Sequence, residues 1–338
     1  MSLQLVGELK SSPMIKRYEN NPIMTSKDVP FKSELVFNSS VIKHKGRYVM
    51  VFRNDYQGEG RWLKNFGIAY SDDGIHFEVG PEPIMELRTE EIRAAYDPRL
   101  TVIDDQIYMT FTTGTRHGVR AALIKTDDFK HFEWIDYAMP DSRNNLLFPE
   151  KINGMYYRLE RPFWSPVDDH SIRTGEWVGR TFDIFISRSP DLRYWGDNQF
   201  LIGTEHIPYA NIKIGGGPVP IKTPKGWLVL IHAVDHDPSR GKNGMCARWT
   251  HRYSAGAMLL DLNDPSKVIG LSRQPLLAPE AEYETSGGFR NDVVFPTAAI
   301  VEDDGQVKIY YGAADAFVCL ATAHIDDLLK VCEPFENA

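Results

Sequence analysis

One carboxylate and several cationic side chains stand at corresponding points of five similar segments of the sequence. The carboxylate is Asp97. The polar residues at the matching points are Asn38, Ser39, Arg53, Arg99, Arg143, Glu160, Arg161, Lys213, His232 and Asp315, and Tyr253 follows on a neighbouring segment. Cations repel one another, so a group of them indicates a site that holds an anion. Phosphate is already negatively charged, so it could attack a sugar without help from a base. Inverting hydrolysis of a sugar instead needs a second carboxylate, which activates water.

Several of these residues also suit other roles. Asp97 precedes Pro98, a pair that also suits a turn. Lys213 precedes three glycines, but no helix pattern follows, so a tight turn is favoured over a phosphate-binding loop. His232 and His236 have the spacing of a metal pair on a helix, yet on a strand they would stand about 13 Å apart. We therefore predict no metal.

Short apolar alternations bounded by turn residues dominate the chain and predict strands. A strand–turn–strand unit recurs at 37–55, 96–114, 145–162, 215–235 and 293–315. A strand running into an acidic turn follows each unit, at 69–77, 124–132, 186–195, 259–268 and 321–330. Five repeats of about 65 residues, each with about four strands, predict an all-β five-bladed propeller, because stacked blades bury both faces of each sheet.

We predict a single domain over residues 1–338, whose first ~30 residues form a peripheral extension or close the ring. The innermost strands of a propeller converge on a central funnel, so the polar residues should meet at its mouth. Tyr96, Phe163, Trp164 and Tyr253 are close to them in sequence and could cover the apolar face of a sugar. The predicted ligands are a sugar and inorganic phosphate.

The composition narrows the class of protein. The 338 residues include 38 Lys and Arg against 46 Asp and Glu, a net charge of −8 that argues against a nucleic-acid partner. No apolar run of about 20 residues predicts a membrane span, and the first residues do not have the pattern of a signal peptide. Three cysteines without a paired framework indicate a reducing compartment, so we expect a cytoplasmic protein.

Several long blocks of the sequence resemble glycoside hydrolase family 130, the β-mannoside phosphorylases. The blocks are FNSSVIKHKGRYVMVFRNDY, AYDPRLTVI, LLFPEKINGMYYRLERPF, DPSRGKNG, RYSAGAMLLDLNDPSKVIG, LLAPEAEYETSGGFRNDVVFP and IYYGAAD. The similarity runs from about residue 17 to 332. AYDPRLT and DPSRGKNG look most like the 4-O-β-D-mannosyl-D-glucose phosphorylases.

The resemblance implies a five-bladed propeller that converts a disaccharide, β-1,4-mannosyl-glucose, and inorganic phosphate to α-D-mannose 1-phosphate and D-glucose with inversion. It implies that Asp97 is the single general acid, passing its proton through the mannose 3-hydroxyl. The implied phosphate site is Arg143, Arg161, Lys213, His232 and Tyr253, and the implied mannosyl contacts are Asn38, Ser39, Arg53 and Asp315. No cofactor is implied beyond phosphate as co-substrate, and homo-oligomers are expected only by analogy.

Alternatives stay open from the sequence alone. An inverting β-mannoside hydrolase could use Glu160 or Asp315 as base, and a silent sugar-binding propeller is a third interpretation. The leaving sugar could also be N-acetylglucosamine or part of a mannooligosaccharide. Residues 165–183 match no family block and could shape that subsite, and Arg99 has no assigned role.

Overall fold

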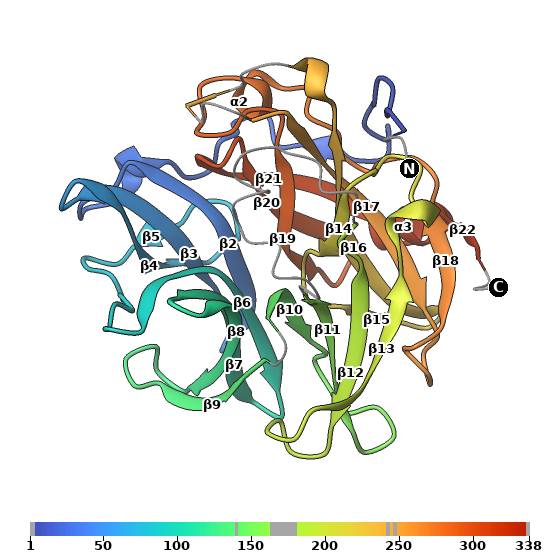
Figure 1. Ribbon diagram of the computed structural model, residues 1–338, viewed down its shortest axis with the longest axis horizontal. Helices are drawn as coiled ribbons and strands as arrows, with labels where there is room; N and C mark the ends of the chain where they lie inside the picture. Colours follow the sequence, from blue (N-terminus) through green and yellow to red (C-terminus); the bar gives the residue numbers. More distant parts are fainter. Residues whose placement is uncertain (1–3, 139–140, 163–180, 241–243, 246–248, 336–338) are drawn as a thin grey trace.

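The computed structural model describes residues 4–138, 141–162, 181–240, 244–245 and 249–335. Their strands form five antiparallel sheets around a central axis, which confirms the predicted all-β propeller of five blades (Figure 1). The loop predicted to shape the leaving-sugar subsite lies largely outside the described residues, as do Phe163 and Trp164. No helix in these ranges is long and apolar enough to cross a membrane, and the cytoplasmic location stays a prediction.

Each recurring sequence unit forms the first two strands of one sheet, and the element after it forms the third. The first sheet contains β2 (Leu35–His44), β3 (Arg47–Gly58), β4 (Arg61–Ser71) and β5 (Glu78–Val79). The second contains β6 (Ile92–Ile103), β7 (Gln106–Thr115), β8 (Gly118–Thr126) and β9 (Glu133–Tyr137). The third contains β10 (Ser142–Leu147), β11 (Tyr156–Pro162), β12 (Ile184–Ser189) and β13 (Gly196–Ile202).

The last two sheets include strands from the chain ends. The fourth contains β14 (Lys213–Gly216), β16 (Gly226–His236), β17 (His251–Leu260) and β18 (Val268–Ser272), with β15 (Ile221–Thr223) beside β16 and β22 (Cys332–Pro334) beside β18. The fifth contains β19 (Val294–Val301), β20 (Gln306–Ala313), β21 (Phe317–His324) and β1 (Lys16–Arg17). Short helices are α2 (Glu282–Thr285) and α3 (Ile325–Lys330), and 3-10 turns cover Ser26–Asp28, Thr204–His206 and Pro238–Arg240.

The fifth sheet takes its outer strand from the start of the chain, because β21 runs into α3 rather than into a fourth strand. β1 pairs antiparallel with β21, and Lys16 stands opposite Thr322. The pairing joins the first described segment to the last blade, and so fixes the fifth blade from both ends of the sequence.

Apolar clusters fill the spaces between adjacent sheets. Pairs that exemplify them are Phe66 with Met109, Leu123 with Leu192, Phe148 with Trp227, Leu230 with Tyr311, and Phe52 with Leu320. The largest members are fully buried, and burial of one such side chain contributes about 1.5–3 kcal/mol. Stacking of the blades therefore supplies the core and holds the innermost strands at fixed positions around the axis.

All five innermost strands depart from regular pairing at the same level. β2 contains an extra residue between Phe37 and Ser40, β6 between Tyr96 and Arg99, and β10 between Arg143 and Leu146. β19 is irregular between Pro296 and Ala298, and β14 ends before β15 begins. Bulges re-aim side chains and are common beside active sites. They mark one level of the propeller as the place where polar groups turn toward the axis.

Candidate active site

The bulges of the first two blades bring Asn38 and Asp97 together. Both residues have positive φ, +48° and +58°, which Asn and Asp tolerate better than most residues. Asn38 Nδ2 donates a hydrogen bond of 2.9 Å to Asp97 Oδ1. Ser39, next to Asn38 in the bulge, is fully buried. The predicted acid is therefore fixed by a neighbouring blade.

A second contact to Asp97 comes from Arg53 on β3. Arg53 Nη1 donates to Asp97 Oδ1 at 3.1 Å, so both contacts fall on the same carboxylate oxygen. The other side of the guanidinium pairs with Asp55, with Nε and Nη2 each 2.7 Å from a carboxylate oxygen. The Phe37 ring lies 4.3 Å from the guanidinium carbon, which leaves Arg53 little freedom to turn.

The charge on Asp97 follows from these neighbours. Burial raises the pKa of this carboxyl, but the positive charges of Arg53 and Arg99 and the hydrogen bond from Asn38 outweigh it, so the pKa lies below the ordinary value. The Asp97 side chain is 16% exposed, which keeps it open to a small ligand. The free protein therefore holds Asp97 as a carboxylate at neutral pH.

The third and fourth blades contribute the cations that were predicted to bind phosphate. Arg161 on β11 donates from Nη1 to His232 Nε2 on β16 at 2.9 Å, and both side chains are buried. The Lys213 ammonium lies 4.7 Å from the centre of the Tyr253 ring, which stacks beside His232 with 6.0 Å between centroids. A hydrogen bond into His232 Nε2 requires a neutral imidazole.

Burial and mutual repulsion perturb these groups strongly. Burial, with the charge of Arg143, lowers the pKa of Arg161 to about 10. Burial and the charges of Arg161 and Lys213 lower the pKa of His232 well below its ordinary value. Burial raises the pKa of Tyr253 to about 12, so this phenol keeps its proton. A bound anion would relieve the repulsion, and the group is suited to hold one.

Tyr96 connects the carboxylate side with the cationic side. Its ring centre lies 5.3 Å from the Arg53 guanidinium carbon and 5.5 Å from that of Arg143. The charges of Asp97 and Arg143 both affect the pKa of Arg161. The structure thus brings the predicted acid and the predicted phosphate residues into one group.

Asp315 lies on the turn between β20 and β21, within the electrostatic reach of Arg53 and Asp97. Its Oδ2 is 3.2 Å from Arg290 Nη1. Burial raises the pKa of Asp315 above the ordinary value, although Arg290 and Arg53 oppose that change. All ten residues predicted for the site therefore occupy one region, which four of the sheets and the turn of the fifth supply.

Glu160 does not belong to that region, which corrects its candidacy as a hydrolytic base. Side chains alternate along a strand, so Glu160 and its neighbour Arg161 point to opposite faces of β11. The Glu160 carboxylate pairs with Arg158 and accepts hydrogen bonds from Ser187 at 2.6 Å and Asn198 at 2.9 Å. These contacts occupy it inside the third blade.

Arg99 has a structural position that the sequence did not indicate. Its Nε donates to the carbonyl oxygen of Gly217 at 2.8 Å, and its Nη1 to that of Pro98 at 2.8 Å. Burial lowers the pKa of this guanidinium to about 10. Arg99 thus connects the second and fourth blades, and its positive charge lowers the pKa of Asp97.

Three residues of the site were missed. Asp55 follows Arg53 by two positions, and strand alternation could have placed both on one face. Arg290 and Trp249 lie outside the recurring units, in segments before β19 and β17, so no comparison of repeats could find them.

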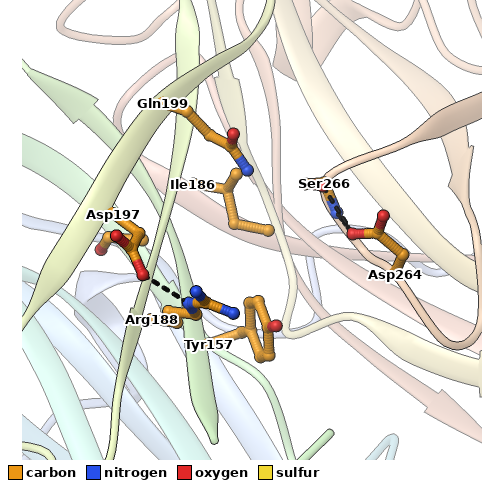
Figure 2. Close-up of a pocket in the computed structure, with 8 residues that line it drawn as sticks. Tyr157, Ile186, Arg188, Asp197, Gln199, Asp264 and Ser266 are labelled. Carbon is orange, nitrogen blue, oxygen red and sulfur yellow. Dashed lines mark hydrogen bonds and ion pairs between the residues drawn. The ribbon is translucent and has the colours of Figure 1, made fainter. Parts of the chain in front are cut away.

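A separate hollow of about 390 Å³ lies between the third sheet and the β17–β18 turn (Figure 2). Its charged groups are already engaged: Arg188 Nε is 2.6 Å from Asp197, and Asp264 bonds Ser266. It gathers no cation group of the kind described above, so the candidate active site is the one around Asp97.

Comparisons with known proteins agree with the fold and identify the family. Residues 10–334 match the model of glycoside hydrolase family 130, described as β-1,4-mannooligosaccharide phosphorylase. The β-1,4-mannooligosaccharide phosphorylase of Ruminococcus albus is 35% identical over 94% of this chain and 90% of its own. The β-1,2-mannobiose phosphorylase of Listeria innocua is 37% identical over 80% of this chain and 69% of its own.

A solved structure of β-1,2-mannobiose phosphorylase from Listeria innocua, in complex with β-1,2-mannobiose, covers 94% of this chain and 99% of its own, with a TM-score of 0.79 and 31% identity. The 4-O-β-D-mannosyl-D-glucose phosphorylase of Bacteroides fragilis is 29% identical over 95% of this chain and 81% of its own. These values support the family but do not single out the predicted mannosylglucose subgroup. The chain is an enzyme of glycoside hydrolase family 130, the family of the mannoside phosphorylases.

Proposed function

We propose that this enzyme catalyses the reversible, inverting phosphorolysis of a terminal β-mannosyl unit. A phosphate oxygen forms a bond to C1 of mannose while the glycosidic C1–O bond breaks, and the leaving oxygen takes a proton that originates on Asp97. The products are α-D-mannose 1-phosphate and the shortened sugar. The observation that carries the proposal is that Asp97 lies within electrostatic reach of Arg161, which pairs with the buried His232, while Lys213 lies over the ring of Tyr253.

The proposed phosphate residues are Arg143, Arg161, Lys213, His232 and Tyr253. Two properties of the group support that role. Arg161 and Lys213 are buried, and Arg143 is close enough for its charge to lower the pKa of Arg161, so a bound phosphate would reduce the repulsion between these cations. His232 and Tyr253 stay neutral at physiological pH, so they can exchange hydrogen bonds with phosphate without adding charge.

The proposed donor-sugar residues are Asn38, Ser39, Arg53 and Asp315. For Asp97 to act as an acid, its carboxylate must gain a proton in the complex with substrate. A sugar that takes over the hydrogen bonds of Asn38 and Arg53 would remove two causes of the low pKa. Both contacts fall on Oδ1, which leaves Oδ2 as the oxygen that faces the transfer. Transfer through the mannose 3-hydroxyl is the route we propose.

The leaving sugar is the finer part of the proposal. The blocks AYDPRLT and DPSRGKNG favour β-1,4-mannosyl-glucose, whereas the description of the matching family model and the Ruminococcus albus relative, which is 35% identical over 94% of this chain, support a β-1,4-mannooligosaccharide. Both substrates present the same β-1,4-linked mannosyl unit, so the chemistry at C1 is common to them. We therefore propose a β-1,4-mannoside donor with glucose or mannose as leaving sugar.

The test is the release of sugar from β-1,4-mannosyl-glucose, β-1,4-mannobiose and β-1,2-mannobiose, with and without inorganic phosphate. We expect α-D-mannose 1-phosphate only when phosphate is present, with its anomeric configuration read by NMR. Equal release of free mannose without phosphate would identify a hydrolase and reject the proposal. A panel of glucose, N-acetylglucosamine, mannose and mannobiose as acceptors of mannose 1-phosphate then determines the leaving sugar.

A further inference from the structure

Arg290 lies in the segment before β19 and contacts both sides of the candidate active site. Its Nη1 is 3.2 Å from Asp315 Oδ2 on the proposed sugar side. Its guanidinium carbon lies 4.6 Å from the centre of the Trp249 ring. The side chain is 30% exposed, so it stands at the edge of the site rather than inside the core.

The backbone around Arg290 holds the turn that carries Asp315. The Arg290 amide donates to the Ala314 carbonyl at 3.1 Å, and the Ala314 amide donates to Val293 at 3.0 Å. Ala314 and Asp315 both have φ of +50°, a left-handed conformation that a surrounding framework must maintain. Gly288 approaches so closely that a Cβ there would lie 2.2 Å from the Ala314 oxygen. The segment and the turn therefore form one fitted unit.

Trp249 extends this unit to the proposed phosphate side. Its indole Nε1 donates to the Asn291 carbonyl at 2.9 Å, next to Arg290. Its ring stacks on Tyr253 with 5.7 Å between centroids and an interplanar angle of 17°. A continuous series of contacts thus runs from Asp315 through Arg290 and Trp249 to Tyr253.

We propose that Arg290 is a positioning residue, which orients the Asp315 carboxylate for the donor sugar and, through Trp249, fixes Tyr253 for phosphate. The proposal rests on the proposed function, because it assigns Asp315 to a sugar contact. An Arg side chain suits the task, since its planar guanidinium can pair with a carboxylate at its edge while its face covers an aromatic ring.

The positive charge of Arg290 should have a measurable effect on the pKa of Asp315. The charged and titratable groups that act on Asp315 are Arg290, Arg53, Asp97 and Asp55, and Tyr253 is also affected by Asp315. Burial and the two carboxylates raise the pKa of Asp315, while Arg290 is the first of the two cations that lower it. Without Arg290 the pKa must rise further, so Asp315 would be protonated at a higher pH and would lose its capacity to accept two hydroxyl hydrogen bonds.

The experiment compares Arg290→Gln with Arg290→Lys in the full chain. Arg47→Gln is the matched control, because Arg47 forms an exposed pair with Asp72 and this substitution removes the same positive charge. Carboxyl carbons of Asp are labelled with ¹³C, and Asp315→Asn identifies the Asp315 resonance. For Arg290→Gln we expect this resonance to titrate at higher pH, with partial return in Arg290→Lys and no change in Arg47→Gln.

Kinetics supply the second measurement. We expect Arg290→Gln to raise KM for the mannoside about tenfold or more and to move the acidic limb of kcat/KM to higher pH. An unchanged Asp315 titration in Arg290→Gln overturns the inference even if activity falls. If that variant does not fold, the Arg290→Lys titration decides in its place. Failure of the wild-type enzyme to form mannose 1-phosphate would reject the proposed function, whereas the NMR titration would still test Arg290.

Discussion

Gly215 is the residue at which the smallest substitution should disturb the proposed phosphate site. It lies on β14 opposite His232, and its φ is not in the left-handed region, so the backbone accepts alanine. A Cβ at this position would lie 2.4 Å from His232 Cε1, 2.7 Å from Nε2 and 3.2 Å from Arg161 Nη1. The effect of Gly215→Ala is therefore steric and falls on the Arg161–His232 pair.

The size of the effect follows from these distances. Ordinary contact begins at 3.4 Å, so the imidazole must move by about 1 Å. His232 is fully buried and its ring centroid is 4.6 Å from that of Phe295, so movement would cost about 1–3 kcal/mol of stability. It would also break the 2.9 Å hydrogen bond from Arg161. Misplacement by 1 Å costs about a hundredfold in rate, and we expect a loss of about tenfold to a hundredfold in kcat/KM for phosphate.

The assay measures mannose 1-phosphate release as a function of phosphate concentration, together with phosphate binding by calorimetry. Gly114→Ala on β7 is the control, because a Cβ there meets no atom within 4 Å. We expect the mannoside affinity of Gly215→Ala to change little, since Asn38 and Arg53 are not displaced. A phosphate KM within twofold of wild type, in a folded variant, would show that His232 and Arg161 do not hold phosphate.

Three further predictions test other parts of the site. Asp97→Asn should lower turnover at least about a thousandfold while phosphate binding by calorimetry stays within twofold, and near-normal kinetics would remove Asp97 as the acid. Asp55→Asn leaves the Arg53 guanidinium partly uncompensated, so we expect about 3–5 kcal/mol lower stability in urea and a raised KM for the mannoside, not for phosphate. The pKa values of His232 and His251 lie well below the unfolded value of 6.5, so the unfolded chain binds more protons and stability falls as pH falls through 6.5. Urea unfolding at pH 7.5 and 5.5 should differ by about 1.4 kcal/mol for each histidine, and His251→Asn should show a smaller difference.

Much of this architecture could be predicted from the sequence because the propeller repeats itself. Five copies of one strand–turn–strand unit give the blade number, and residues at matching points of the copies meet around the axis. Asn38, Asp97 and Arg143 are found in this way, at or beside the bulges of three consecutive inner strands. However, matching positions do not reveal toward which face of a sheet each side chain points. Glu160 and Arg161 are neighbours in one unit, but strand alternation sends only Arg161 toward His232.

The parts that could not be predicted are those that depart from the repeat. The sequence left open whether the first ~30 residues form a peripheral extension or close the ring, and no local pattern indicates that Lys16–Arg17 is the outer strand of the fifth blade. Arg290 and Trp249 belong to segments without counterparts in the other blades, and their importance depends on contacts with Asp315 and Tyr253. Such contacts depend on the folded geometry of irregular segments rather than on periodicity.

The residues at repeat positions and their partners at other positions contribute differently to this site. Residues at matching positions of the repeats bring a carboxylate and several cations together near the axis. The repeat alone does not determine which of these cations pairs with a carboxylate. The pairing is determined by partners that break the symmetry: Asp55 occupies two nitrogens of Arg53 and leaves the third for Asp97, while the cations of the other blades face His232 and the ring of Tyr253. Arg53 thus pairs with two carboxylates on the proposed sugar side, whereas Lys213 lies against the ring of Tyr253, a neutral phenol, on the proposed phosphate side. We expect this difference in partners, rather than the number of cations, to decide which side of the site takes the sugar and which takes the phosphate.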